Sequence, residues 1–227
     1  MLDTLIANLD AGTTQIEAAE IEALAGRLRG PVLLPDNAAY DEARSVWNAM
    51  IDRKPGLIVR CLGASDVVQA VRFAREHNLL LSVRGGGHNI AGNAVCDGGL
   101  LIDLSQMRSV RVDPSIQRAW VEPGALLSDL DKETQAVFLA LPTGINSTTG
   151  IAGLTLGGGF GWLTRKHGLT LDNLMTADVV TADGELLRTS LTENSDLFWA
   201  IRGGGGNFGI VTTFEFQLHQ VGPQVLS

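Results

Sequence analysis

The sequence has little cysteine, no excess of basic residues and no long apolar run, and each absence narrows the class of protein. Its 227 residues include two cysteines, Cys61 and Cys96, which excludes a disulfide framework and a Cys-x-x-Cys metal or redox pair. The formal net charge of −8 disfavours nucleic acid as a partner, because phosphate backbones require a basic surface. No segment approaches the roughly 20 apolar residues that span a membrane. Acidic residues but no Lys or Arg precede Arg27, the reverse of a signal peptide, so we expect a cytoplasmic protein that contacts neither nucleic acid nor membrane.

Several familiar cofactor and metal motifs are also missing. There is no Gly-Lys pair, which a Walker A loop requires, and no His-Glu-x-x-His. The four histidines have no metal-ligand spacing, so we predict no metal site. A Rossmann loop needs Gly-x-Gly-x-x-Gly between a strand and a helix. Residues 85–90 lack the last glycine, and residues 204–209 match the letters but follow a predicted helix and precede a predicted strand, which disfavours a nicotinamide dehydrogenase.

The hydrophobic pattern predicts a mixture of strands and helices. Residues 1–30 indicate a weakly amphipathic helical lead-in, and the texture of the sequence changes at Pro31. Asp36 and Ser65 are candidate N-caps of two helices, the first running to about Asn48. Further helices are expected at residues 125–136 and 194–201. Strands are expected at residues 32–34, 57–61, 80–84, 100–103, 109–113, 118–121, 175–182, 185–189 and 210–218.

This order of elements predicts an α+β fold of two lobes. Residues 57–84 form a βαβ unit, which should pair in parallel with a right-handed crossover. The later hairpins indicate a mixed or antiparallel sheet. We therefore expect a small parallel lobe at about residues 31–103 and a larger lobe at about 104–220. Residues 221–227 resemble a linker, which we interpret as leading to a missing C-terminal substrate domain.

A glycine loop at residues 84–89, Arg-Gly-Gly-Gly-His-Asn, is the most informative feature that is present. Three adjacent glycines remove the side chains from one face of a turn, so that backbone N–H groups can surround an anion. The loop follows a predicted strand, at the end of the strand where open α/β folds bind ligands. His88 is an ordinary hydrogen-bonding loop residue or a nucleophile beside the anion. A cofactor with a pyrophosphate and an electrophilic ring, such as flavin adenine dinucleotide (FAD), would suit the second interpretation.

A second glycine-rich region occupies residues 143–161. Residues 143–150, Thr-Gly-Ile-Asn-Ser-Thr-Thr-Gly, offer small hydroxyl side chains and free N–H groups, and residues 153–161 add five glycines. Tight turns that pack strands together would explain them, and a flat ring with polar edges would fit equally well. Trp162 and Trp199 are expected to be core aromatics.

Three long motifs together resemble one known family. They are Arg-Gly-Gly-Gly-His-Asn at residues 84–89, the run at 153–162 followed by Asp-Asn-Leu at 172–174, and residues 196–212, which include Arg-Gly-Gly-Gly-Gly-Asn-Phe-Gly-Ile-Val. In this order they are similar to the FAD-binding (PCMH-type) domain of the vanillyl-alcohol-oxidase superfamily. Within it, the berberine-bridge-enzyme-like FAD-linked oxidoreductases are the nearest branch. The resemblance runs from about residue 31 to 220.

The resemblance implies how FAD would be held. The first loop would bind the pyrophosphate, and His88 would carry an 8α-histidyl bond to the flavin. Segments 143–150 and 153–161 would line the isoalloxazine ring and ribityl chain, with the adenine near Ile210 and Val211. Asn146 stands where many relatives have a second flavin-linking cysteine, so no cysteinyl bond is expected. The implied cofactor-binding residues are Arg84, Gly85, Gly86, Gly87, His88, Asn89, Gly92, Gly124, Thr143, Gly144, Asn146, Ser147, Thr148, Gly150, Gly153, Gly158, Gly161, Trp162, Ile210 and Val211.

The resemblance also implies the chemistry. Hydride would pass from a small-molecule substrate, alcohol-like, sugar-like or a secondary metabolite, to flavin N5, and O2 or another acceptor would reoxidise the flavin. The catalytic base would lie in the missing substrate domain, so no residue of this chain is assigned to catalysis. The alternative is a flavin-binding fragment without turnover of its own, which needs the missing domain or a partner chain.

Overall fold

The computed structural model describes residues 3–222, which form two compact units. The N-terminal unit comprises the described residues up to Met107 together with Val180–Leu186. The C-terminal unit comprises Arg108–Val179 and the described residues from Leu187 onward. The boundary therefore lies after Met107, where the sequence predicted one after residue 103, and the excursion at 180–186 was not foreseen. Of the predicted linker, residues 223–227 lie outside the described part of the chain.

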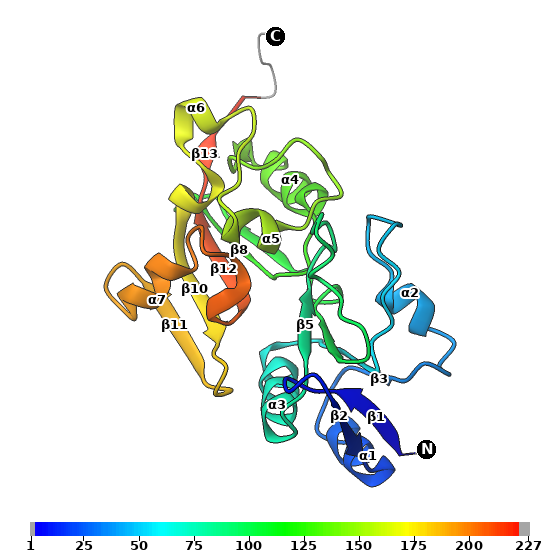
Figure 1. Cartoon of the computed structure of the whole chain (residues 1–227). Helices are drawn as coiled ribbons and strands as arrows, with labels where there is room; N and C mark the ends of the chain where they lie inside the picture. Colours follow the sequence, from blue (N-terminus) through cyan, green and yellow to red (C-terminus); the bar gives the residue numbers. More distant parts are fainter. Residues whose placement is uncertain (1–2, 223–227) are drawn as a thin grey trace. The chain divides into compact units, whose positions relative to one another are not determined.

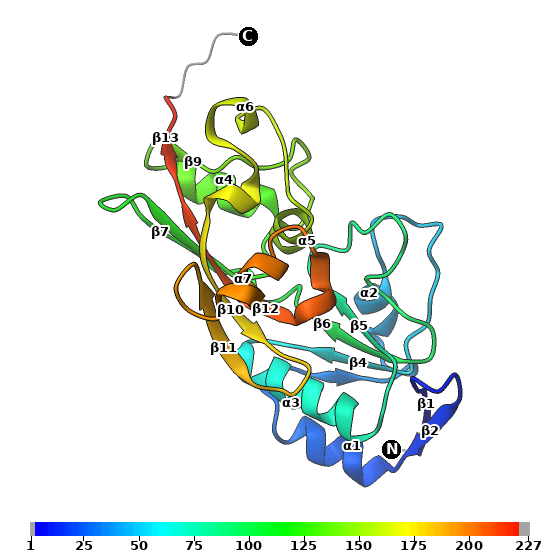
Figure 2. The same cartoon turned by 60° about the vertical axis from the view of Figure 1, so that its left-hand side comes forward.

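The N-terminal unit is built on a four-stranded sheet in the order β3-β4-β6-β5 (Figure 2). Strand β3 (Val32–Leu33) is antiparallel to β4 (Leu57–Arg60), whereas β4 and β5 (Leu81–Arg84) each pair in parallel with β6 (Leu100–Asp103). The predicted βαβ unit is thus parallel, but its two strands do not pair with each other, because β6 lies between them. All four residues of β6 are buried, as expected of the central strand of a parallel sheet.

Helices cover both faces of this sheet. Helices α1 (Ala18–Ala25) and α3 (Ala64–Glu76) lie on one side and α2 (Tyr40–Arg44) on the other (Figure 2). The α2 side has its own core of buried residues, in which Tyr40 and Ala43 pack with Ile58 and Leu101 of the strands. Helix α3 begins after Gly63, so the predicted cap Ser65 lies inside its first turn.

Two predictions for this unit were wrong. Residues 4–16 are a hairpin of β1 (Thr4–Ala7) and β2 (Thr13–Ile16), not a helix, because the Asn8 carboxamide accepts the N–H groups of Asp10 and Gly12 and closes a turn. Helix α2 is also much shorter than the predicted 36–48. The chain becomes extended at Ser45, and the backbone that follows bonds to the glycine loop instead of continuing the helix.

The C-terminal unit contains a five-stranded sheet in the order β11-β10-β12-β8-β7 (Figure 1 and Figure 2). Its strands are β7 (Val110–Asp113), β8 (Arg118–Val121), β10 (Leu174–Val180), β11 (Leu186–Ser190) and β12 (Ile210–Gln217). Strand β8 is antiparallel to both β7 and β12. A smaller ladder joins β9 (Leu139–Ala140) to β13 (His219–Gln220). Along β12 the residues alternate, with Phe214 and Phe216 fully buried in the core.

Short helices connect these strands. They are α4 (Leu127–Gln135), α5 (Ile151–Leu156), α6 (Thr164–His167), α7 (Ser195–Ala200) and the 3-10 turns η1 (Thr170–Asn173) and η2 (Gly205–Phe208). The combination of parallel and antiparallel pairing with helices confirms the α+β prediction. Across residues 3–222, no helix is both long and apolar enough to cross a bilayer.

Candidate functional site

The carboxyl ends of the three parallel strands carry a row of charged residues. Arg60, Asp103 and Arg84 are the last residues of β4, β6 and β5 and are register partners. The fully buried Asp103 carboxylate accepts the Nε–H of Arg60 at 3.0 Å and that of Arg84 at 3.1 Å. Two guanidinium groups on one carboxylate leave a net single positive charge at this edge of the sheet.

The Arg84 side chain is fully engaged within this row. Its Nη2 lies 2.9 Å from Asp103 Oδ2, and its Nη1 donates to the Ser45 carbonyl at 2.7 Å. The side chain is also buried. Arg84, predicted as a cofactor ligand, can therefore act on a ligand through its charge and its backbone. Its guanidinium N–H groups are used in bonds to Asp103 and Ser45.

The glycine loop that follows Arg84 presents unused backbone donors. Within residues 3–222, the N–H groups of Gly85, Gly86 and Gly87 donate to no protein acceptor. Gly87 has a φ of 71°, in the left-handed region that favours glycine, and its carbonyl accepts the Trp47 N–H at 3.1 Å. Consecutive N–H groups without a protein acceptor among residues 3–222, beside a fixed positive charge, are a candidate anion cradle.

His88 and Asn89 complete the loop. The His88 ring is half-buried and stacks on Trp47, with centroids 5.0 Å apart and planes at 23°. Asn89 is exposed, and its carbonyl and side-chain oxygens accept the N–H groups of Gly92 and Asn93. Gly92 is buried, and a Cβ there would lie 2.9 Å from Ile51. Asn89 and Gly92 thus shape the turn after the loop.

In the C-terminal unit, the loop at residues 143–150 touches the loop at 159–162, which holds the predicted residues Gly161 and Trp162. A Cβ on Gly161 would lie 1.8 Å from the Thr143 carbonyl oxygen and 3.5 Å from the Gly144 Cα. The Asn146 carboxamide oxygen accepts both the N–H and the hydroxyl of Thr148, so it is occupied within its own loop. The other predicted residues of this unit are Gly124 and Gly158, which are buried, Gly150, which caps α5, and the exposed Ser147.

At Gly153, no contact within the described part of the chain explains why the residue is a glycine. It is exposed on α5, and a Cβ there would have no neighbour within 4 Å. A glycine inside a helix costs about 1 kcal/mol relative to alanine. An open face without side chains is what the close approach of a flat ligand requires, so this position fits a flavin.

The same two loops expose large apolar side chains. Ile145 is 72% exposed, Phe160 77% and Trp162 87%, and we call these three the apolar patch. Trp199 on α7 is 77% exposed. The expectation that Trp162 and Trp199 are core aromatics was therefore wrong. Three large apolar side chains left exposed on two touching loops make the apolar patch a candidate binding surface.

Ile210 and Val211, predicted near the adenine, begin β12 and are buried. Their side chains belong to the core of the C-terminal unit, so only their backbone could reach a ligand. Reasoning from the sequence did not single out Trp47, Ser45, Arg60 or Asp103. Arg60 and Asp103 could have been found, because Asp103 ends the strand predicted at residues 100–103 and Arg60 is the last residue but one of the strand predicted at 57–61.

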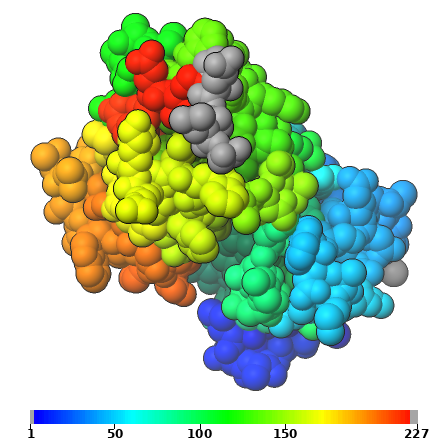
Figure 3. Space-filling view, turned by 90° about the horizontal axis from the view of Figure 1, so that it is seen from above, coloured from blue at the N-terminus to red at the C-terminus, as the bar shows by residue number. Residues whose placement is uncertain are grey.

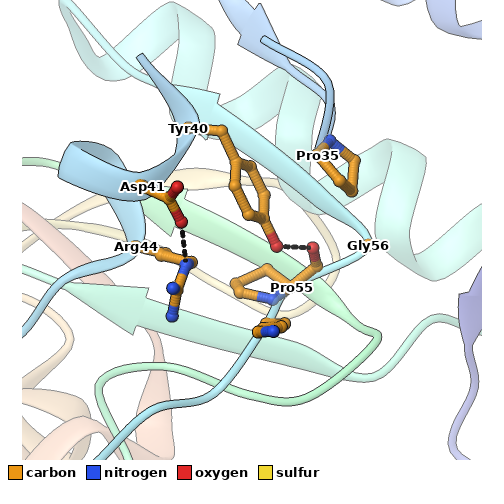
Figure 4. A pocket seen from close by; sticks show the side chains of 7 residues that line it. Pro35, Tyr40, Asp41, Arg44, Pro55 and Gly56 are labelled. Atoms are coloured by element: carbon orange, nitrogen blue, oxygen red, sulfur yellow. Dashed lines mark hydrogen bonds and ion pairs between the residues drawn. The ribbon is translucent and has the colours of Figure 1, made fainter. Parts of the chain in front are cut away.

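A hollow of about 450 Å³ lies elsewhere in the N-terminal unit (Figure 4). Its wall includes Tyr40, whose hydroxyl donates to the Pro55 carbonyl at 2.6 Å, and Arg44, which is paired with Asp41 and Asp52. It adjoins Gly56, just before β4 begins. Open α/β sheets bind ligands at the carboxyl ends of their strands, so this hollow is at the wrong end to be the ligand site.

Comparison with known proteins identifies the ligand. The chain matches the model of one protein family, described as an FAD binding domain, over residues 55–190. It is 42% identical over 200 residues to (R)-6-hydroxynicotine oxidase of Paenarthrobacter nicotinovorans, an alignment that covers 88% of this chain and 44% of that protein.

Solved structures agree. Glucooligosaccharide oxidase from Acremonium strictum, with a 6-S-cysteinyl, 8α-N1-histidyl FAD, matches with a TM-score of 0.83 and 35% identity over 88% of this chain and 42% of that one. A BBE-like protein of Physcomitrella patens matches with a TM-score of 0.82 and 30% identity, covering 88% of this chain and 44% of that one.

The chain therefore belongs to the FAD binding domain family, and its relatives are FAD-linked oxidoreductases and BBE-like oxidases of the vanillyl-alcohol-oxidase superfamily. The resemblance and the α+β fold predicted from the sequence are both confirmed. The chain spans less than half the length of these relatives.

Proposed function

We propose that this chain is the flavin-binding portion of an FAD-dependent oxidase. The whole protein would take a hydride from a C–H bond of an alcohol-like, sugar-like or secondary-metabolite substrate onto flavin N5, and O2 or another acceptor would remove the electrons. The relatives, which include a hydroxynicotine oxidase and a glucooligosaccharide oxidase, support this class of reaction. We assign no catalytic base within residues 1–227 and expect it in the additional length that the relatives have.

The glycine loop carries the proposal. Its unused N–H groups and the net positive charge of Arg60, Asp103 and Arg84 would offset the charge of a pyrophosphate without a direct Lys or Arg contact. In the C-terminal unit, the open face at Gly153 and the loop at 143–150 would serve the flavin ring and ribityl chain. FAD itself supplies the hydride acceptor, and the protein supplies binding, orientation and electrostatics.

We further propose a single covalent link, from a His88 ring nitrogen to the flavin 8α carbon. Asn146 cannot form the second, cysteinyl link, because an amide is not a nucleophile comparable to a thiolate. The two cysteines cannot replace it. Cys61 and Cys96 are buried, and burial raises the pKa of each thiol, which disfavours the reactive thiolate.

The test is the visible spectrum and acid stability of the flavin in the purified chain. We expect an oxidised flavin spectrum, a yellow pellet after acid precipitation, and flavin on the His88 peptide alone in a digest. His88→Ala should bind FAD but release it in acid, whereas Gly86→Val should bind none, because its side chain would fill the anion cradle. A colourless chain that cannot be reconstituted with FAD would refute the proposal.

A flavin-binding fragment without turnover is the second candidate, and the short length relative to the relatives favours it for this chain by itself. Co-expression with the remaining part of a relative would separate the two. Restored substrate oxidation supports an oxidase divided into parts, and flavin binding that never leads to turnover supports the non-catalytic alternative.

A further inference from the structure

The short segment Ser45–Trp47, which we call the brace, follows α2 and is attached to the glycine loop at three points. Its Ser45 carbonyl accepts Arg84 Nη1 at 2.7 Å, and its Trp47 N–H donates to the Gly87 carbonyl at 3.1 Å. The Trp47 indole then stacks on the His88 imidazole. All three contacts lie within the N-terminal unit.

The brace is anchored to the buried charged row at the edge of the sheet. Arg84 is held by the fully buried Asp103, whose carboxylate also receives Arg60 and the Ser105 hydroxyl. A charge-assisted network of this kind, closed on every side, fixes the side chains that form it. The contacts with the sheet edge therefore fix the position of the brace backbone, and this backbone in turn positions the Trp47 side chain.

Trp47 itself contributes little to the core. The residue is 62% exposed, although burial is what usually makes tryptophan favourable in a fold. Its stack on His88 is close to parallel, at 23°, so the indole covers one face of the imidazole. The lone pair of an imidazole nitrogen lies in the ring plane, and a stacked partner fixes that plane without blocking the nitrogen edges.

We propose that Trp47 is a positioning residue that fixes the plane of the His88 imidazole for covalent attachment of the flavin. This inference rests on the His88 link proposed above. In the attachment, a bond forms between a His88 nitrogen and the 8α carbon, and one C–H bond of the 8α methyl group and the imidazole N–H bond break. The two hydrogens, as two protons and two electrons, are left on the flavin, and dioxygen accepts them to give hydrogen peroxide.

The indole aids this step in two ways. Orientation lowers the entropic cost of bringing the nitrogen to the carbon, and loss of such alignment costs on the order of 10²-fold in rate. The attacking imidazole also becomes positively charged before it loses its proton, and the face of an indole stabilises a cation stacked upon it. A phenyl ring at position 47 would retain part of the orientation and part of the charge stabilisation, whereas a methyl group would provide neither.

The experiment compares Trp47→Ala and Trp47→Phe with the wild type and with Trp199→Ala, a matched loss of an exposed tryptophan in the C-terminal unit. Apoprotein is mixed with FAD, total binding is measured by fluorescence quenching, and acid-stable flavin is followed with time. We expect Trp47→Ala to bind FAD within about twofold of wild type but to attach it roughly 10–100-fold more slowly. Trp47→Phe should be intermediate and Trp199→Ala unchanged.

A readout without flavin checks the geometry. In the apoprotein, the carbon-bound protons of the His88 ring should be shifted upfield by the indole ring current, and the shift should vanish in Trp47→Ala. Attachment by Trp47→Ala at the wild-type rate, or equal loss of FAD binding and attachment, would overturn the inference while leaving the His88 link in place. A wild type without acid-stable flavin would overturn the His88 link, and this inference with it.

Discussion

Gly161 and Gly153 belong to the same glycine-rich segment but meet opposite constraints. A Cβ on Gly161 would overlap the Thr143 carbonyl oxygen at 1.8 Å, whereas one on Gly153 would meet nothing within 4 Å. We expect Gly161→Ala to lower the free energy of unfolding by about 1–3 kcal/mol, since backbone must move to accommodate the methyl group. Gly153→Ala should raise it by about 0.5–1 kcal/mol, because alanine favours the helix.

Urea unfolding of the two apoprotein variants measures both changes in the free energy of unfolding, and titration with FAD measures the affinity of each variant for the cofactor. If Gly153 is kept open for the flavin, Gly153→Ala should weaken FAD binding although it stabilises the protein. A stabilised variant with unaltered FAD affinity would show that this face is not used by the cofactor.

Asp103 is the residue on which the edge of the parallel sheet depends. Replacement by Asn leaves the Arg60 and Arg84 guanidinium groups without their buried counter-charge. Breaking a buried ion pair in this way costs about 3–5 kcal/mol, so we expect that loss in the free energy of unfolding of Asp103→Asn. Ser105→Ala, which removes one hydroxyl bond to the same carboxylate, is the control and should cost about 1 kcal/mol. Equal effects of the two substitutions would argue against a charged network.

Individual residues show where reasoning from sequence succeeds and where it stops. The absence of side chains from the glycine loop could be read from the sequence, whereas the absence of acceptors for its N–H groups among the described residues is seen only in the structure. Trp47 could not be found in this way, because only the path of the chain after α2 brings its ring to His88. Trp162 and Trp199 were misjudged, because an aromatic residue on the surface can have the same local sequence pattern as one in the core.

Among the elements, those with a strong local sequence pattern were predicted. Those with a weak local pattern, or with a position that depends on distant contacts, were not. The buried apolar strands β4, β5 and β6 lie close to where their hydrophobic runs predict them. Their order differs, because the placement of β6 at the centre depends on burial of all its residues. The hairpin β1-β2 was mistaken for a helix, since the side chain that closes its turn leaves only a weak signal in the sequence.

The end strand β13 is attached to α6 and η1 by two histidines, His167 and His219. The rings of His167 and His219 stack with centroids 3.9 Å apart, and His219 Nε2 lies 2.6 Å from the Asn173 side-chain oxygen. In Figure 3 the red atoms of this strand border the yellow atoms of that region. Desolvation lowers the pKa of both rings, with Lys166 adding to the effect and His167 also acting on His219.

A lowered pKa in the folded state makes stability depend on pH in a definite direction. In the unfolded chain a histidine takes up a proton near pH 6.5, whereas the folded pair resists it. The stabilisation is thus present above about pH 6.5 and is lost as the pH falls through the lower, folded-state pKa values. We expect the urea concentration at the unfolding midpoint to decrease as the pH is lowered from 7.5 to 5.5. The decrease should be smaller in His219→Gln, because a glutamine side chain does not take up a proton in this range. An equal decrease of the urea midpoint in His219→Gln would show that other titratable groups cause the pH dependence.

For the molecule taken as a whole, the family match covers residues 55–190, and the relatives are about twice as long as this chain. The proposed cofactor site would account for the motifs of the sequence. Among the described residues of the C-terminal unit, none covers the exposed apolar patch of Ile145, Phe160 and Trp162. A general base must lie within hydrogen-bond reach of the substrate proton, and no residue of these motifs is left for that task.

We therefore expect the 227-residue chain to hold FAD without oxidising a substrate. Anaerobic mixing with 6-hydroxynicotine or a glucooligosaccharide, substrates suggested by the names of its relatives, should leave the flavin absorbance unchanged. Dithionite should bleach the same sample, which shows that the bound flavin can be reduced and that only the transfer from substrate is missing. Rapid bleaching by either compound would mean that this chain already contains a substrate pocket and a base, and His167, His219 and the acidic residues of the C-terminal unit would then be the first positions to test.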